Sequence, residues 1–110
     1  MDTFSALAEP TRRNILELLA NSGQLSATEI YQKFSVSSPA ISQHLKVLRE
    51  ANLVHMEKRA QQRLYQINPA SLSELEGWIK KLTKQYDERF DVLDTLLEIE
   101  KKKLAKTRLR

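Results

Sequence analysis

Apolar residues recur three or four positions apart in four stretches of the chain, which is the spacing of one face of an α-helix. Pro10 begins the first stretch, and Asn21-Ser22-Gly23 ends it. Its apolar positions are Ile15, Leu18 and Leu19. The second stretch begins with Ser26 and Glu29, which have the spacing of a capping box, and it ends near Ser35. The pattern therefore predicts two short helices in the first third of the chain.

The third stretch begins at Ser37-Ser38-Pro39, a strong N-terminal signal, and is expected to run to about residue 51. Its apolar positions are Ile41, Leu45 and Leu48. The period then changes to two over residues 53–58 and 63–67, which predicts a β-hairpin. The connecting residues 59–62 contain no Gly or Asn, so we expect a longer, mobile tip rather than a tight turn.

The fourth stretch, 69–103, is too long for its own domain. At ~1.5 Å per residue it is about 50 Å long, whereas a small domain is only ~30 Å across. Its apolar stripe is therefore expected to bury against the same helix of a second copy. The stripe consists of Leu72, Leu75, Ile79, Leu82, Tyr86, Phe90, Leu93 and Leu97. The alternative is a helical hairpin broken at Gly77, which ranks second because Glu76 and Trp78 are not turn formers.

Together these elements predict a mostly α fold with a small β-hairpin. The arrangement is that of a winged helix-turn-helix domain over residues 1–103, with a long C-terminal dimerisation helix and a basic tail at 104–110. Within it, the recognition helix is expected at about 37–51, the wing at about 53–67 and the long helix at about 69–103.

Charge is distributed unevenly along this arrangement. Residues 36–69 carry a net charge of +3 and residues 101–110 a net charge of +6, whereas 1–35 and 70–100 carry −1 and −4. A localised basic region is what a polyanion binder needs, and double-stranded DNA is the expected partner. The chain has no cysteine, no apolar run long enough for a membrane span or signal peptide, and no catalytic constellation. We therefore expect a cytoplasmic protein without cofactor or metal that is not an enzyme.

The exposed face of the predicted recognition helix is small, polar and cationic, as contact with base edges requires. Its expected DNA-contacting residues are Ser37, Ser38, Pro39, Ala40, Ser42, Gln43, His44 and Lys46. The hairpin adds Arg59, Gln62 and Arg63, which suit the DNA backbone or minor groove. For His44, simple exposure remains an alternative. One of Arg12 and Arg13 is expected either to pair with Glu9 or Glu17 or to contact a phosphate. The basic tail could also contact DNA, but it is more simply explained as a disordered end.

Two segments of the chain resemble the ArsR/SmtB-type winged-helix repressors, closest to the metal-independent branch that includes autorepressors of the SdpR kind. They are residues 6–16, ALAEPTRRNIL, and residues 38–54, SPAISQHLKVLREANLV. The resemblance implies a homodimer that binds an operator, with bases contacted by the recognition helix and the backbone by the hairpin. It also implies dimerisation through the first and last helices, where the expected interface residues are Phe4, Leu7, Leu82, Tyr86, Phe90, Leu93 and Leu97.

The chain departs from the metal-sensing members of that family. The positions that match their paired cysteines are Ser26 and Thr28, and residues 70–110 contain no His. An oxygen-only site on the last helix would need Asp87, Asp91 and Asp94, which are more simply a solvated acidic face. The expected function is therefore a sequence-specific dimeric repressor without a cysteine-based metal sensor. The alternatives are a winged-helix protein-interaction module, or a repressor with an effector site on the last helix near Trp78 and Tyr86.

Overall fold

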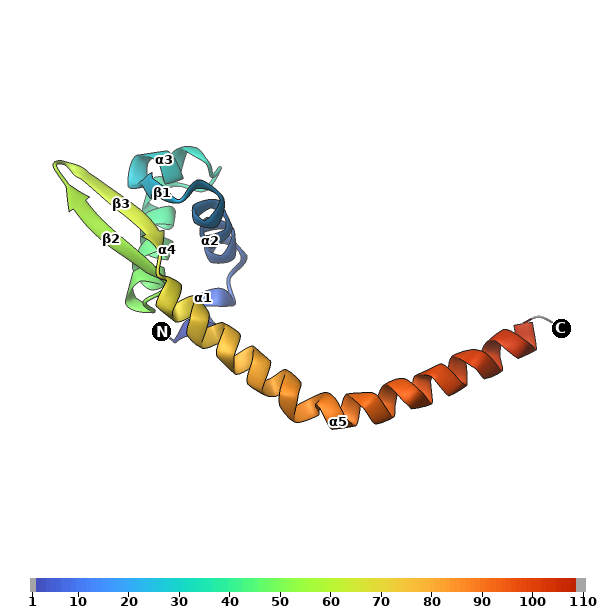
Figure 1. Cartoon of the computed structure of the whole chain (residues 1–110). Coiled ribbons are helices and arrows are strands. Elements are labelled where there is room, and N and C mark those ends of the chain that lie inside the picture. Colours follow the sequence, from blue (N-terminus) through green and yellow to red (C-terminus); the bar gives the residue numbers. More distant parts are fainter. Residues whose placement is uncertain (1, 109–110) are drawn as a thin grey trace. The chain divides into compact units, whose positions relative to one another are not determined.

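The computed structural model describes the backbone of residues 2–108, with the side chains of residues 2–87 and 96–104. The chain divides into two compact units, Met1–Ser73 and Glu74–Arg110. In the described residues the first unit holds the helices α1–α4 and a three-stranded sheet, and the second unit consists of most of α5 (Figure 1). The expected fold class, mostly helical with a winged helix-turn-helix, is confirmed.

Two helices come before the helix-turn-helix pair. The apolar spacing did not predict α1, Thr3–Leu7, which Asp2 caps by accepting a hydrogen bond from the Ser5 N–H at 2.7 Å. Because this helix is so short, it has no periodic pattern to detect. The predicted α2 spans Pro10–Ser22. Gly23 ends it at φ +84°, a backbone conformation that glycine adopts without steric cost.

The helix-turn-helix pair is α3, Ala27–Gln32, and α4, Ser38–Glu50. The capping box predicted for α3 is formed in both directions: the Glu29 N–H donates to Ser26 Oγ at 3.2 Å, and the Ser26 N–H donates to Glu29 Oε1 at 3.0 Å. At the start of α4, Ser37 Oγ accepts from the Ala40 N–H at 3.4 Å. Local sequence therefore sets where both helices begin.

The end of α4 is a Schellman motif, in which Asn52 takes the left-handed conformation at φ +60°. The Leu53 N–H donates to the Leu48 carbonyl at 2.9 Å, and the Asn52 N–H donates to the Arg49 carbonyl at 3.0 Å. Leu48 and Leu53 are both fully buried, which supplies the apolar contact typical of this motif. The motif turns the chain directly from the recognition helix into the wing.

The wing belongs to a three-stranded antiparallel sheet rather than to an isolated hairpin. Its strands are β1, Gln24–Ser26, β2, Val54–Arg59, and β3, Gln62–Ile67, in the order β1-β3-β2. In the register, Leu25 lies opposite Tyr65 in the first pair of strands, and Met56 lies opposite Tyr65 in the second. The pattern of apolar positions does not predict β1, because three residues are too few to show an alternation. The sheet therefore connects the start of α3 to the wing.

The turn of the hairpin is shorter than the sequence analysis predicted. Arg59 pairs with Gln62, which leaves only Ala60 and Gln61 between the strands. Ala60 takes φ +57°, so the tight turn forms although no Gly or Asn is present. Cross-strand pairing along the whole of β2 and β3 outweighs the local cost of that conformation.

One hydrophobic core lies under the helices and the sheet of the first unit. The apolar faces predicted for α2, α3 and α4 all contribute to it. Its largest fully buried side chains are Ile15, Leu19, Ile30, Ile41, Leu45, Leu48, Leu53 and Val54. Each such side chain stabilises the fold by ~1.5–3 kcal/mol. The burial of Ile41, Leu45 and Leu48 fixes the rotation of α4 about its axis, and therefore decides which of its residues face outward.

The last helix, α5, spans Pro69–Arg108 without interruption, so the alternative of a hairpin at Gly77 is excluded. Residues 104–108, expected in a tail, continue the helix. At its start the Asn68 side-chain amide donates to the Asn52 carbonyl at 2.8 Å, and the Ser71 hydroxyl donates to the same carbonyl. Over the described residues, none of the helices is both long and apolar enough to span a membrane.

Candidate nucleic-acid interface

The outward face of α4 is made of small and polar side chains. Ser42, Gln43 and Lys46 are exposed there, and Ala40 is half-buried at the beginning of the helix. The N-terminal residues Ser37, Ser38 and Pro39 are exposed as well. This face has hydroxyl and amide groups that can donate and accept hydrogen bonds, positive charge, and no large apolar side chain. Such a surface can enter a DNA groove without clashing or burying unmatched apolar area.

A hollow of about 130 Å³ lies between α4 and β3. It is lined by Ser42, Gln43, Lys46 and Arg49 from α4 and by Arg63 and Tyr65 from β3. The structure thus brings predicted recognition-helix residues together with a predicted wing residue. Arg49 also belongs to this set and was missed by the sequence analysis. Its spacing from Ser42 and Lys46, seven and three residues, places all three on one face of α4 and could have identified it.

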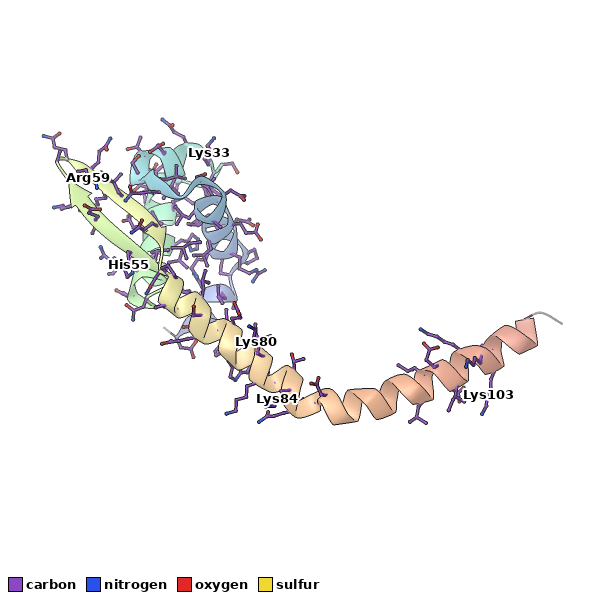
Figure 2. All side chains as sticks on the ribbon, viewed as in Figure 1. Lys33, His55, Arg59, Lys80, Lys84 and Lys103 are labelled. Atoms are coloured by element: carbon purple, nitrogen blue, oxygen red, sulfur yellow. The ribbon has the colours of Figure 1, made fainter. Side chains whose placement is uncertain are left out.

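The tip of the wing carries Arg59 beside Glu57. One guanidinium nitrogen of Arg59 lies 3.2 and 3.4 Å from the two carboxylate oxygens of Glu57, and both side chains are exposed. Figure 2 shows Arg59 at the far end of the hairpin and His55 near its base. Gln62, the cross-strand partner of Arg59, is also exposed. The charge of Arg59 is therefore partly neutralised inside the wing, and an exposed pair of this kind adds only ~0–1 kcal/mol to stability.

His44 differs from the other predicted DNA-contacting residues because its ring faces α2. Its side chain is only 20% exposed, and its Nδ1 lies 3.2 Å from a guanidinium nitrogen of Arg12. A guanidinium group can only donate, so Nδ1 is the acceptor and the proton of a neutral ring lies on Nε2. Nε2 is 3.9 Å from Glu9 Oε2. His44 therefore connects the recognition helix to the helix behind it.

Arg12 is the centre of this connection. Its side chain is buried, and besides His44 it donates to the Ala6 carbonyl at 2.7 Å and to the Ser5 carbonyl at 3.2 Å. The end of α1 and the middle of α4 are thus held by one guanidinium group. Burial disfavours the charged form of Glu9, but the hydrogen bond from the Arg12 N–H and the nearby His44 together hold its pKa below the ordinary value. By contrast, the neighbouring Arg13 is exposed and donates to the Leu7 carbonyl at 2.6 Å.

The residues predicted for a dimer interface lie on α1 and α5. Phe4 is 52% exposed, and Leu7 is half-buried against the core. On α5, Leu82 is half-buried, while Tyr86 and Leu97 are exposed. The side chains of Phe90 and Leu93 lie outside the described residues. Further exposed apolar residues of α5 are Leu72, Trp78, Ile79, Leu96, Ile99 and Leu104.

Of the two positions that match the paired cysteines of metal-sensing relatives, Ser26 has a structural role in this chain. Ser26 is buried, and its hydroxyl accepts from the Glu29 N–H, so it is committed to the cap of α3. Across the described side chains, no three His, Asp or Glu residues gather as a metal ion would require. Asp91 and Asp94, considered for an oxygen-only site, lie outside that part of the chain.

Comparisons with known proteins agree with the winged helix-turn-helix geometry. Residues 9–56 match the family described as "Bacterial regulatory protein, arsR family". The transcriptional repressor SdpR of Bacillus subtilis is 35% identical over 78 residues, which cover 71% of this chain and 86% of that protein. The HTH-type transcriptional regulator Rv2034 of Mycobacterium tuberculosis is 42% identical over 85 residues, which cover 73% and 78%.

A solved structure is similar as well. The ArsR-like transcriptional regulator from Rhodococcus sp. RHA1 matches with a TM-score of 0.71 at 27% identity, over 84% of this chain and 87% of that one. The family match begins at the N-cap of α2 and ends within β2, so it contains the whole helix-turn-helix and the start of the wing. This chain therefore belongs to the arsR family of bacterial regulatory proteins, and it is a DNA-binding transcriptional regulator rather than an enzyme.

Proposed function

We propose that the protein is a homodimeric repressor that binds a specific operator sequence. In this proposal α4 reads base edges in the major groove, and the wing contacts the adjacent backbone or minor groove. The base-reading set is Ser37, Ser38, Pro39, Ala40, Ser42, Gln43 and Lys46, and the wing set is Arg59, Gln62 and Arg63. His44 takes a positioning role instead, because Arg12 occupies its Nδ1. A repressor acts where the chromosome lies, so the proposed location is the cytoplasm.

The observation that carries this proposal is the composition of the outward face of α4. Its buried side fixes the orientation of the helix, and its exposed side consists of groups that match base edges in size and hydrogen-bonding capacity. Gln43 is exposed in the middle of that face, where its amide can bond two atoms of one base. Arg63, on β3, lines the hollow beside it and supplies charge without sequence information.

Two alanine variants test whether Gln43 contacts bases and Arg63 contacts the DNA backbone. Binding-site selection from random duplexes first supplies the operator. Gln43→Ala should then lower affinity for the operator by ~1–3 kcal/mol and relax the preference at one base pair. Arg63→Ala should lower the affinity for operator and non-operator DNA equally. The assignment is reversed if Arg63→Ala changes the base preference while Gln43→Ala leaves it intact. A wild-type protein that selects no sequence would favour the protein-interaction module.

The proposed dimer rests on the apolar side chains of α5. A 40-residue helix is ~60 Å long, and Ile79 and Leu97 on it are 50% and 48% exposed. Exposed apolar residues repeated along one helix are typical of a surface that pairs with a second helix. The most economical partner is the same helix of another copy, related by a two-fold axis, because each chain then covers the other.

Light scattering of matched variants tests the dimer. The wild-type chain should be dimeric at micromolar concentration. Leu97→Glu should shift it toward the monomer, because the new carboxylate would have to be buried without a partner. Glu98→Gln, at the neighbouring exposed position, should leave the mass unchanged. A stable wild-type monomer at micromolar concentration would contradict the proposal.

A further inference from the structure

We propose that the hollow between α4 and β3 holds one backbone phosphate of bound DNA, contacted jointly by Arg49 and Arg63 with Lys46 beside them. This inference rests on the proposed function, and it goes beyond it by adding Arg49 and by making helix and wing share a single contact. The hollow is lined by both elements, so one group inside it can touch residues from each.

The charges around the hollow favour an anion. Lys46, Arg49 and Arg63 all line it, and within the described part of the chain none of the three has a carboxylate within ion-pair distance. By contrast, Arg59 is paired with Glu57 and Lys80 with Glu76. Three unpaired cations in one small space repel each other, and an anion among them relieves that repulsion.

The size and chemistry of the hollow fit a phosphate group. Its volume of about 130 Å³ is about four times the ~30 Å³ of one water molecule in the liquid, which leaves room for a phosphate and its hydration. Guanidinium groups bind phosphate oxygens through two parallel N–H bonds, and Arg49 and Arg63 approach from different elements. The Ser42 hydroxyl and the Gln43 amide supply neutral donors beside them. Tyr65 is the one aromatic residue of the lining and is only 6% exposed, and the other five lining residues are polar or charged, so the hollow does not favour a hydrophobic ligand.

The position of the hollow identifies the phosphate as one of the DNA backbone. Ser42 and Gln43 line the hollow and also belong to the face proposed to read bases. A group held there lies next to the base edges that those residues would contact, which is where the phosphates that flank the major groove run. A phosphate held between helix and wing would fix the register of α4 along the groove. The two arginines should therefore act as one unit in DNA binding.

Salt-dependent binding to DNA tests this unit. The probe is a short fluorescein-labelled duplex of fixed mixed sequence, measured by anisotropy at several KCl concentrations. Arg49→Gln and Arg63→Gln should each reduce the magnitude of the slope of log K against log salt by less than about 0.9 per protomer, because the remaining arginine still neutralises the shared phosphate. The double variant should reduce it by about 0.9 per protomer, the value for one phosphate contact, because both arginines hold the same phosphate. Lys80→Gln, which removes a charge already paired with Glu76, should leave the slope unchanged.

The outcomes separate this inference from the proposed function. If the wild-type protein binds DNA and the double variant has the same slope as the wild type, only the phosphate site is wrong. If the slope of log K against log salt for the double variant falls in magnitude by about 1.8 per protomer, the two arginines hold different phosphates and the shared site is wrong. Inorganic phosphate at constant ionic strength should not compete with the duplex; if it displaces wild-type protein but not the double variant, the hollow binds free phosphate instead. Failure of the wild-type chain to bind any duplex would overturn both the phosphate site and the proposed function. Far-UV circular dichroism verifies that each variant is folded.

Discussion

Replacing Arg12 by Lys keeps the charge but removes the planar fork that joins α1 to α4. In the wild-type chain the guanidinium group donates to the Ala6 carbonyl at 2.7 Å, to the Ser5 carbonyl at 3.2 Å and to His44 Nδ1 at 3.2 Å. A single ammonium group at the end of a flexible chain can satisfy only one of these three acceptors in that geometry. Arg12→Lys therefore loses two hydrogen bonds with a charged donor.

The expected loss of stability follows from those two bonds. Hydrogen bonds that involve a charged group contribute ~1.5–3 kcal/mol each, and we take the lower value because both are only part-buried and water can replace them. The free energy of unfolding should therefore fall by about 3 kcal/mol. With a urea m-value of about 2 kcal/mol per molar, the unfolding midpoint should fall by about 1.5 M. The protein concentration must be held fixed, because stability of a dimer depends on it.

Arg13→Lys is the matched control. Arg13 is adjacent in sequence, exposed, and donates to one carbonyl, that of Leu7, which a lysine can also reach. Its free energy of unfolding should stay within about 0.5 kcal/mol of wild type. If Arg12→Lys and Arg13→Lys unfold at the same urea concentration, the planar guanidinium group of Arg12 contributes nothing to stability that an ammonium group cannot supply.

Three further predictions concern the caps and metal ions. Asn52 is at φ +60°, a conformation that glycine adopts more easily than alanine. Asn52→Gly should therefore raise the free energy of unfolding by about 0.5–1 kcal/mol, and Asn52→Ala should lower it. Thermal melts in which Asn52→Ala is the more stable variant would contradict the Schellman assignment. Hydrogen bonds from the Ser26 N–H and hydroxyl lower the pKa of Glu29, so its contribution to stability is complete above the ordinary value of 4.5 and is lost as the pH falls through the folded-state pKa. Between pH 7 and about pH 3, the free energy of unfolding measured in urea should therefore fall more for the wild type than for Glu29→Gln. Equal decreases would be inconsistent with this cap. Low-micromolar Zn²⁺, Cd²⁺ or arsenite should not release the protein from DNA, because the chain has no cysteine; a loss of binding that EDTA reverses would reveal an oxygen-ligand site.

The features that the sequence predicted well are those set by neighbouring residues. The capping box of Ser26 and Glu29, the Ser37 cap and the spacing of Ile41, Leu45 and Leu48 all concern interactions within one or two helical turns. Because such interactions depend on local sequence, the helix-turn-helix could be located and the outward face of α4 deduced by elimination.

The features that the sequence did not predict depend on residues distant in the chain. Ala60 adopts a positive φ because long strands on either side pair in register, which no property of Ala60 indicates. The ring of His44 faces α2 because Arg12 provides its partner, and the two are 32 residues apart. Arg49 joins the hollow only because β3 passes beside α4. In each case tertiary context overrides the local pattern.

The pairing of β1 with β3 has a consequence for how the chain acquires its structure during synthesis. Ser26 is both the last residue of β1 and the N-cap of α3, and its strand partner is Leu64 near the other end of the first unit. When the ribosome has released the chain only as far as the recognition helix, the backbone of residues 24–26 therefore has no strand partner. Because such distant contacts form late, the winged domain should fold only after β3 has been made. A peptide containing α3 and α4 alone should accordingly not form a stable DNA-binding fragment.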